Sequence, residues 1–132
     1  MDIAAAGGIV FDDAGRLLLI RRGRPPGAGL WSVPGGKCHP GEPPDVACVR
    51  ELREETGLVA RVVSHAGQVV RPSGPDDRFV IDDFVCTVEG STTPTAGDDA
   101  DAVGWFSAAD FDRLDLVPLL SETLAEWGLL PR

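Results

Sequence analysis

The sequence predicts an α/β protein in which a mixed β-sheet is sandwiched between α-helices (α/β/α). Runs of aliphatic and β-branched residues, suited to strands, occur at residues 3–11, 16–22, 59–70, 79–88 and 103–106. Amphipathic segments with helical spacing alternate with these strands at residues 44–57, 108–111 and 118–130. A chain of 132 residues suits one domain, residues 1–132, with a core that needs no disulfide or structural metal.

The first two predicted strands flank a turn. Residues 3–11 are mostly small and apolar, and they end at Asp12-Asp13-Ala14-Gly15, a strong turn signal. The continuous apolar run at residues 17–20 follows at once, so we expect a strand pair joined by a tight turn. A third, short strand at residues 31–33 is interrupted by Pro34-Gly35-Gly36, where the backbone can approach a ligand closely.

A helix is predicted between Pro44 and Gly57. Proline suits the first position of a helix, and glycine readily takes the left-handed conformation that ends one. The spacing i, i+3, i+4 places three carboxylates on one face of this helix, those of Glu51, Glu54 and Glu55. A neighbouring apolar stripe, which includes Cys48 and Leu52, gives the helix a face to bury.

Three carboxylates on one short helical face repel one another, and a bound cation would remove that repulsion. A set of oxygen ligands without His or Cys suits a hard ion, Mg²⁺ or Mn²⁺. Arg50 lies four residues before Glu54 and is expected to orient it. The alternative interpretation is a solvated acidic face that pairs with Arg50 and Arg53.

The second half of the chain reads as strands followed by helices. Residues 59–70 form one strand or two, and His65 between them is assigned to packing or solvent. In the strand at residues 79–88, Asp82 and Asp83 interrupt the apolar pattern. The last helix, residues 118–130, is expected to face the core with Leu119, Leu120, Leu124 and Trp127.

The region around the acidic helix resembles a complete Nudix box. That pattern is a glycine, five residues, a glutamate, seven residues, and then Arg-Glu-apolar-any-Glu-Glu-any-Gly-apolar. The matching positions are Gly36, Glu42, Arg50, Glu51, Leu52, Glu54, Glu55, Gly57 and Leu58. The segment Trp31-Ser32-Val33-Pro34-Gly35 is the usual lead-in of such domains.

This resemblance implies hydrolysis, by water, of a diphosphate bond in a nucleoside diphosphate linked to another group. Glu51 and Glu55 are then the first choice as metal ligands, with the Gly35 carbonyl in the same shell. Glu54 is either a third ligand or the base that accepts the proton from water, and Arg50 positions it. An additional acid is expected from the segment before the last strand, namely Asp98, Asp99 or Asp101.

Three arginines, Arg21, Arg22 and Arg24, precede the loop that leads to Trp31 and the glycines of the box. The guanidinium fork suits phosphate oxygens, so these side chains are candidates for substrate binding. Solvated charges at the end of a strand are the alternative.

The resemblance leaves the substrate open between two groups of enzymes. ADP-ribose or a related nucleotide sugar is favoured, because Gly97-Asp98-Asp99-Ala100 looks more like the ADP-ribose group. The proline that marks that group falls at Gly74 here, although Pro72 and Pro75 lie close by. The alternatives are a MutT-like hydrolase of nucleoside triphosphates such as oxidised dGTP, and a non-catalytic module that binds a nucleotide.

The amino-acid composition limits the kinds of partner that the protein is expected to bind. A net charge of −9 disfavours nucleic acid, and a local divalent ion reconciles that charge with a phosphorylated substrate. No apolar run approaches the roughly 20 residues that cross a bilayer, and the start lacks the basic region of a signal peptide. We therefore expect a cytoplasmic protein, a monomer or a homodimer, that binds a small nucleotide and no membrane. Its three cysteines, with no metal or redox spacing, are expected to be reduced.

Overall fold

The computed structural model describes residues 1–132. Seven strands and three helices follow one another along the chain: β1 (Asp2–Val10), β2 (Leu17–Arg22), β3 (Trp31–Ser32), β4 (Gly35–Lys37), α1 (Pro44–Thr56), β5 (Val59–Pro72), β6 (Arg78–Glu89), β7 (Ala100–Phe106), α2 (Ala108–Phe111) and α3 (Leu120–Glu126). None of the helices is long and apolar enough to cross a membrane.

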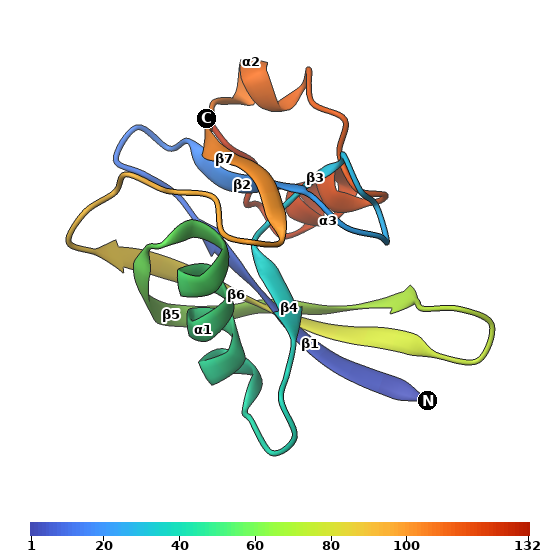
Figure 1. Cartoon of the computed structure of the whole chain (residues 1–132). Coiled ribbons are helices and arrows are strands. Elements are labelled where there is room, and N and C mark those ends of the chain that lie inside the picture. The colour runs from blue at the N-terminus through green and yellow to red at the C-terminus, as the bar shows by residue number, and fades with distance from the viewer.

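The strands form two sheets. The four-stranded sheet has the order β4-β1-β6-β5, in which β1 runs parallel to β6 and antiparallel to β4. The three-stranded sheet has the order β3-β2-β7 and is antiparallel throughout. In Figure 1, α1 lies across the four-stranded sheet, whereas α2 and α3 lie beside the three-stranded one. The predicted α/β class with a mixed sheet between helices is confirmed, although the strands divide into two sheets.

Consecutive residues of the first strands are buried on opposite sides, which explains why their sequences are apolar without interruption. Val10 and Leu18 pack in one cluster with Leu52 of α1. Ile9 packs in a second cluster, together with Leu124 of α3. The helices therefore cover both faces of the sheets, and α1 is anchored by its buried apolar stripe.

The bounds of α1 agree with those predicted from the sequence. Pro43 is the extended residue before the helix, and Pro44 begins it. Gly57 ends it in the left-handed conformation, with φ of 73°, and its N–H donates to the carbonyl of Arg53. These local signals set which residues of α1 share a face.

The expectation that β1 and β2 pair as a hairpin is wrong. The two strands touch only at the turn, through the bridge between Phe11 and Leu17 and the hydrogen bond from Asp12 N–H to the Arg16 carbonyl (3.0 Å). Beyond the turn each strand joins a different sheet. Both strands are buried on both sides and each has two strand neighbours, so each becomes an inner strand of its own sheet.

The last helix is shorter than predicted. It spans Leu120–Glu126 instead of residues 118–130, because Leu119 takes a left-handed conformation (φ 69°) and Gly128 also has a positive φ. Leu119 is 51% exposed, so the prediction that it faces the core is wrong. Leu124 is buried as predicted, and Leu120 and Trp127 pack against its cluster.

Residues 59–72 form one continuous strand, β5, with irregular register near Val62 and again near His65. Together β5 and β6 make a long hairpin that projects from the body of the molecule beside the N-terminus (Figure 1). His65 packs edge-on against Phe84 and lies 3.0 Å from the carboxylate of Asp82, in keeping with its assignment to packing.

Candidate active site

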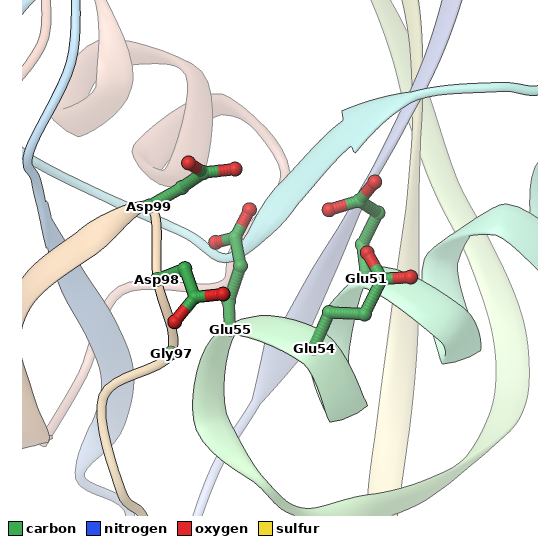
Figure 2. Close-up of a pocket in the computed structure, with 6 residues that line it drawn as sticks. All are labelled: Glu51, Glu54, Glu55, Gly97, Asp98 and Asp99. Atoms are coloured by element: carbon green, nitrogen blue, oxygen red, sulfur yellow. The ribbon is translucent and has the colours of Figure 1, made fainter.

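A cleft of about 260 Å³ separates the second half of α1 from the loop that precedes β7. Its lining contains no hydrophobic residue and consists of Glu51, Glu54, Glu55, Gly97, Asp98 and Asp99. Figure 2 shows the three glutamates rising from the helix, with the two aspartates on the loop beside Glu55. Two segments more than forty residues apart in the sequence thus present five carboxylates to one space.

The three glutamates lie at different depths. Glu55 is only 8% exposed, because it is on the side of α1 nearest the core. The side chain of Glu51 is 14% exposed and that of Glu54 is 56% exposed. Glu54 is therefore the glutamate of the helix that meets solvent, whereas Glu51 and Glu55 are partly or fully enclosed.

Gly97 brings the loop against the end of α1. Its N–H donates to the carbonyl of Glu55 (3.0 Å), and the N–H of Thr95 donates to the carbonyl of Thr56 (2.8 Å). A Cβ atom at Gly97 would collide with the backbone carbonyl of Glu54. A glycine is therefore required for the loop to approach the helix this closely.

Arg50 connects the glutamates to the preceding loop. Its Nη1 donates to Glu51 (2.8 Å) and to Glu54 (3.1 Å), so the predicted contact with Glu54 is present. Its Nε and Nη2 donate to Glu42 (2.9 and 2.8 Å), and Nη2 also reaches the carbonyl of Lys37 (3.0 Å). One guanidinium thus orients two carboxylates of the cleft and braces the loop before the helix.

Glu42 lies behind the cleft, not in its lining. Its carboxylate accepts hydrogen bonds from the Arg50 side chain and from the backbone N–H of His39, 3.0 Å away. The bond from Arg50 is the largest cause that lowers the pKa of Glu42 to about 2. Glu42 is therefore ionised, and its hydrogen bonds brace the loop before α1.

Glu55 carries a buried carboxylate oxygen, Oε2, that has no hydrogen-bond partner. Burial, and after it the negative charge of Glu51, raises the pKa of Glu55 to about 8. A backbone hydrogen bond from Gly35 acts in the opposite direction but is outweighed. Without a cation, this carboxyl is disfavoured in its charged form, so the site has a place for a positive charge beside it.

The donor chemistry of the cleft fits a hard divalent cation, since every side chain that lines it offers only carboxylate oxygens. No group of three or more His, Cys, Asp or Glu side chains is arranged closely enough to hold a metal ion. Glu51 and Glu54 instead accept hydrogen bonds from Arg50. Binding a cation therefore requires carboxylates to turn from the guanidinium toward the cleft.

The three candidate aspartates are separated by the structure. Asp98 and Asp99 line the cleft, whereas Asp101 is outside its lining and lies 3.9 Å from the guanidinium of Arg21. The carboxylate of Asp99 is also 3.0 Å from Nε of Arg24. Of the three, Asp98 and Asp99 are placed to act with the glutamates.

The three arginines predicted to bind substrate gather near this loop. Arg21 lies 5.9 Å above the ring of Trp31, and Trp31 packs edge-on against Phe106. Arg22 donates to the carbonyl of Pro26 (2.6 Å), and its charge is close enough to lower the pKa of Glu55. Arg24 is exposed and forms an ion pair with Asp99, which lines the cleft.

Two glycines shape the site in ways that the sequence did not reveal. A Cβ at Gly36 would lie 2.6 Å from the carboxyl carbon of Glu51, so this glycine makes room for a cleft residue. Gly97 has the comparable role toward α1. Both glycines lie in stretches rich in turn-forming residues. In such a stretch the sequence does not distinguish a glycine that is needed for a turn from one that lets another segment pack closely.

The raised pKa of Glu55 predicts a pH dependence of stability. The folded protein keeps a proton that the unfolded chain releases near the ordinary value of 4.5, so the free energy of unfolding falls as pH rises from 4.5 to about 8. The contribution is at most about 1.4 kcal/mol per pH unit. Urea unfolding of the metal-free protein across this range measures it.

The variant Glu55→Gln is the control, since it removes the titrating group and keeps the shape. Burial raises the pKa of Asp83 to about 6. In both proteins Asp83 therefore also lowers the free energy of unfolding as pH rises, but only up to about pH 6. We expect the slope above pH 6 to be shallower in Glu55→Gln than in the native chain. Equal slopes would mean that Glu55 ionises freely and that its environment is wrongly described.

Known proteins resemble this chain in both sequence and fold. A family model described as NUDIX domain matches residues 1–127. An ADP-ribose pyrophosphatase of Methanocaldococcus jannaschii is 35% identical over 111 residues, 83% of this chain and 64% of that protein. A Bacillus subtilis (strain 168) protein, named as a candidate 8-oxo-dGTP diphosphatase, is 32% identical over 99 residues, 75% of this chain and 62% of that protein.

Each of these two alignments spans less than two thirds of the curated relative's own length. Among solved structures, a MutT NUDIX hydrolase from Burkholderia pseudomallei superposes with a TM-score of 0.83 at 28% identity. That match covers 95% of this chain and 97% of the other. The resemblance therefore extends over nearly the whole chain and is not limited to the acidic helix and its loop.

Proposed function

The chain belongs to the Nudix family, and from this membership we propose that it hydrolyses the diphosphate bond of a nucleoside diphosphate linked to another group. The observation that carries the proposal is the cleft lined by five carboxylates, one of which has a buried oxygen with no partner. A purely structural acidic face would be solvated or paired, whereas Oε2 of Glu55 is buried and has no hydrogen-bond partner. The family match confirms the resemblance first seen in residues 36–58, and we propose that residues 1–132 form one domain.

Nudix hydrolases generally use divalent metals, and we propose Mg²⁺ here, with Mn²⁺ as a substitute. Glu51 and Glu55 are the proposed ligands, together with the carbonyl of Gly35 and Asp98 or Asp99, and Glu54 would be a third ligand only if it is not the base. When bound, such an ion lowers the pKa of water and neutralises charge on the diphosphate. The net charge of −9 supports a site of this kind over a basic surface that binds nucleic acid.

Water is the proposed nucleophile, because the lining of the cleft contains no hydroxyl, thiol or amine side chain. Glu54 is the proposed base. Its carboxylate is exposed at the cleft, where a water molecule can reach it, and it accepts a hydrogen bond from Arg50 (3.1 Å). Glu51 and Glu55 are more enclosed and suit a role as ligands. Arg50 is thus a positioning residue, since it contacts Glu54 and Glu51 and lies outside the lining.

Arg24 is proposed to bind a substrate phosphate, with Arg21 and Arg22 beside it. It is exposed, and its ion pair with Asp99 places it at the edge of the cleft. We expect Arg24→Ala to raise KM roughly tenfold, the equivalent of one charge-assisted hydrogen bond, with little change in kcat. Steady-state kinetics measure both constants.

The matched control is Arg78→Ala, which breaks another exposed arginine–aspartate pair, the one that Arg78 at the start of β6 makes with Asp2 at the start of β1. We expect that variant to keep the KM of the native chain. A similar rise in KM in both variants would show a general effect of net charge and would remove Arg24 from the substrate site.

ADP-ribose or a related nucleotide sugar is the proposed substrate, with an oxidised nucleoside triphosphate as the second candidate. Two curated relatives support these two choices, one named for each activity. The loop with Asp98 and Asp99, which favoured the ADP-ribose group in the sequence, lines the cleft.

A substrate panel with Mg²⁺ tests the proposal. ADP-ribose, nucleotide sugars, canonical and oxidised nucleoside triphosphates and dinucleoside polyphosphates are compared by kcat/KM and by their products. We expect ADP-ribose to give AMP and ribose 5-phosphate with the highest kcat/KM. Release of pyrophosphate from oxidised dGTP as the best reaction would select the second candidate. Binding without turnover, with Mg²⁺ or Mn²⁺, would overturn hydrolysis in favour of a nucleotide-binding module.

A further inference from the structure

Two buried cysteines from distant parts of the chain meet beneath the acidic helix. Sγ of Cys48, on α1, lies 3.6 Å from Sγ of Cys86, on β6, and the two residues are 0% and 3% exposed. They are 38 positions apart in the sequence. Neither thiol takes part in the proposed hydrolysis, and both face the core cluster on the side of the sheet away from α2 and α3.

We propose that Cys48 and Cys86 form a modification site, at which a small peroxide oxidises the pair to an intramolecular disulfide. Cys86 loses its proton, and its thiolate attacks one oxygen of hydrogen peroxide. The O–O bond breaks, the departing hydroxide takes up that proton as water, and Cys86 is left as a sulfenic acid. The sulfur of Cys48 then attacks that sulfur, and the hydroxyl departs with the Cys48 proton as water. The pair loses two electrons, and peroxide gains two and ends as two molecules of water.

The surroundings of the two sulfurs set the order of these steps. The hydrogen bond between the thiols lowers the pKa of Cys86 and raises that of Cys48, where burial acts in the same direction. Cys86 is therefore the better nucleophile and Cys48 the partner that resolves it. Because both residues are enclosed, an oxidant near the size of water is required, and a bulky disulfide such as glutathione is excluded from the folded state.

Bond formation has a structural consequence. A disulfide bond is about 2.0 Å long, so the sulfurs must approach by about 1.5 Å. The link would join α1 to β6 and close the chain between them, which restricts the unfolded state and raises the temperature of unfolding. Cys38, the third cysteine, is half-buried in the loop before α1 and has no sulfur partner.

The test uses the full chain and hydrogen peroxide, for the native sequence and for Cys38→Ser. We expect the intact mass to fall by two hydrogen atoms and two thiols to be lost from titration under denaturing conditions, which leaves one thiol in the native sequence and none in Cys38→Ser. A non-reducing peptide map should join Cys48 to Cys86, and a dithiol reductant should restore both thiols. The oxidised form should unfold several degrees above the reduced form.

The variant Cys86→Ala in the Cys38→Ser background is the control, and it should gain oxygen or remain unchanged. The proposal is overturned if the native chain keeps three titratable thiols, if it gains oxygen without a cross-link, or if the cross-link includes Cys38. None of these measurements depends on hydrolysis, so the result stands apart from that of the substrate panel.

Discussion

Replacing Glu54 by Gln is expected to lower turnover by about 10²- to 10⁴-fold, the range for loss of a general base. Glutamine keeps the size of the side chain but cannot accept the proton of the attacking water. Since the Glu54 side chain is 56% exposed, the fold should be unaffected. The measurements are kcat with the best substrate of the panel in Mg²⁺, and the thermal unfolding temperature.

The matched control for this variant is Glu126→Gln, which makes the same change of charge at an exposed position at the end of α3. We expect it to keep the native turnover. Near-normal turnover in Glu54→Gln would assign the base elsewhere on the cleft. A loss of turnover together with a lower unfolding temperature would mean that the substitution damages the fold, and the rate could not then be attributed to proton transfer.

Replacing Gly97 by Ala is expected to reduce both stability and metal affinity. The added Cβ would collide with the carbonyl of Glu54, and the nearest atoms all belong to the backbone of α1, which has little room to adjust. The loop must move away, which breaks the hydrogen bond from Gly97 N–H to the carbonyl of Glu55 (3.0 Å) and withdraws Asp98 and Asp99 from the cleft. Overpacking of this kind costs about 1–3 kcal/mol of unfolding free energy.

Urea unfolding measures this loss, and calorimetry with Mn²⁺ shows whether metal affinity falls with it. The control is Gly104→Ala on β7, where the added Cβ would meet only the ring of Phe106 at 3.3 Å, a side chain that can yield. We expect that control to be close to the native chain. Native stability and metal affinity in Gly97→Ala would show that the loop tolerates a side chain and that its close approach to α1 is not required.

The features of the site that depend on neighbouring residues could be read from the chain. Proline and glycine set the two ends of α1, and helical periodicity then placed Glu51, Glu54 and Glu55 on one face. The contact between Arg50 and Glu54 spans one helical turn and follows from the same geometry. These predictions succeeded because a helix is built from hydrogen bonds within a few residues, so its sequence contains the information needed.

The features that depend on distant segments required the folded chain. Whether Asp98, Asp99 or Asp101 faces the glutamates is decided by the path of the loop that Gly97 presses against α1. The partners of β1 and β2 depend on strands far along the sequence, and an apolar run fits either sheet. The meeting of Cys48 with Cys86 likewise arises where helix and sheet pack. Long-range contacts follow from packing and strand register, which no local pattern of residues specifies.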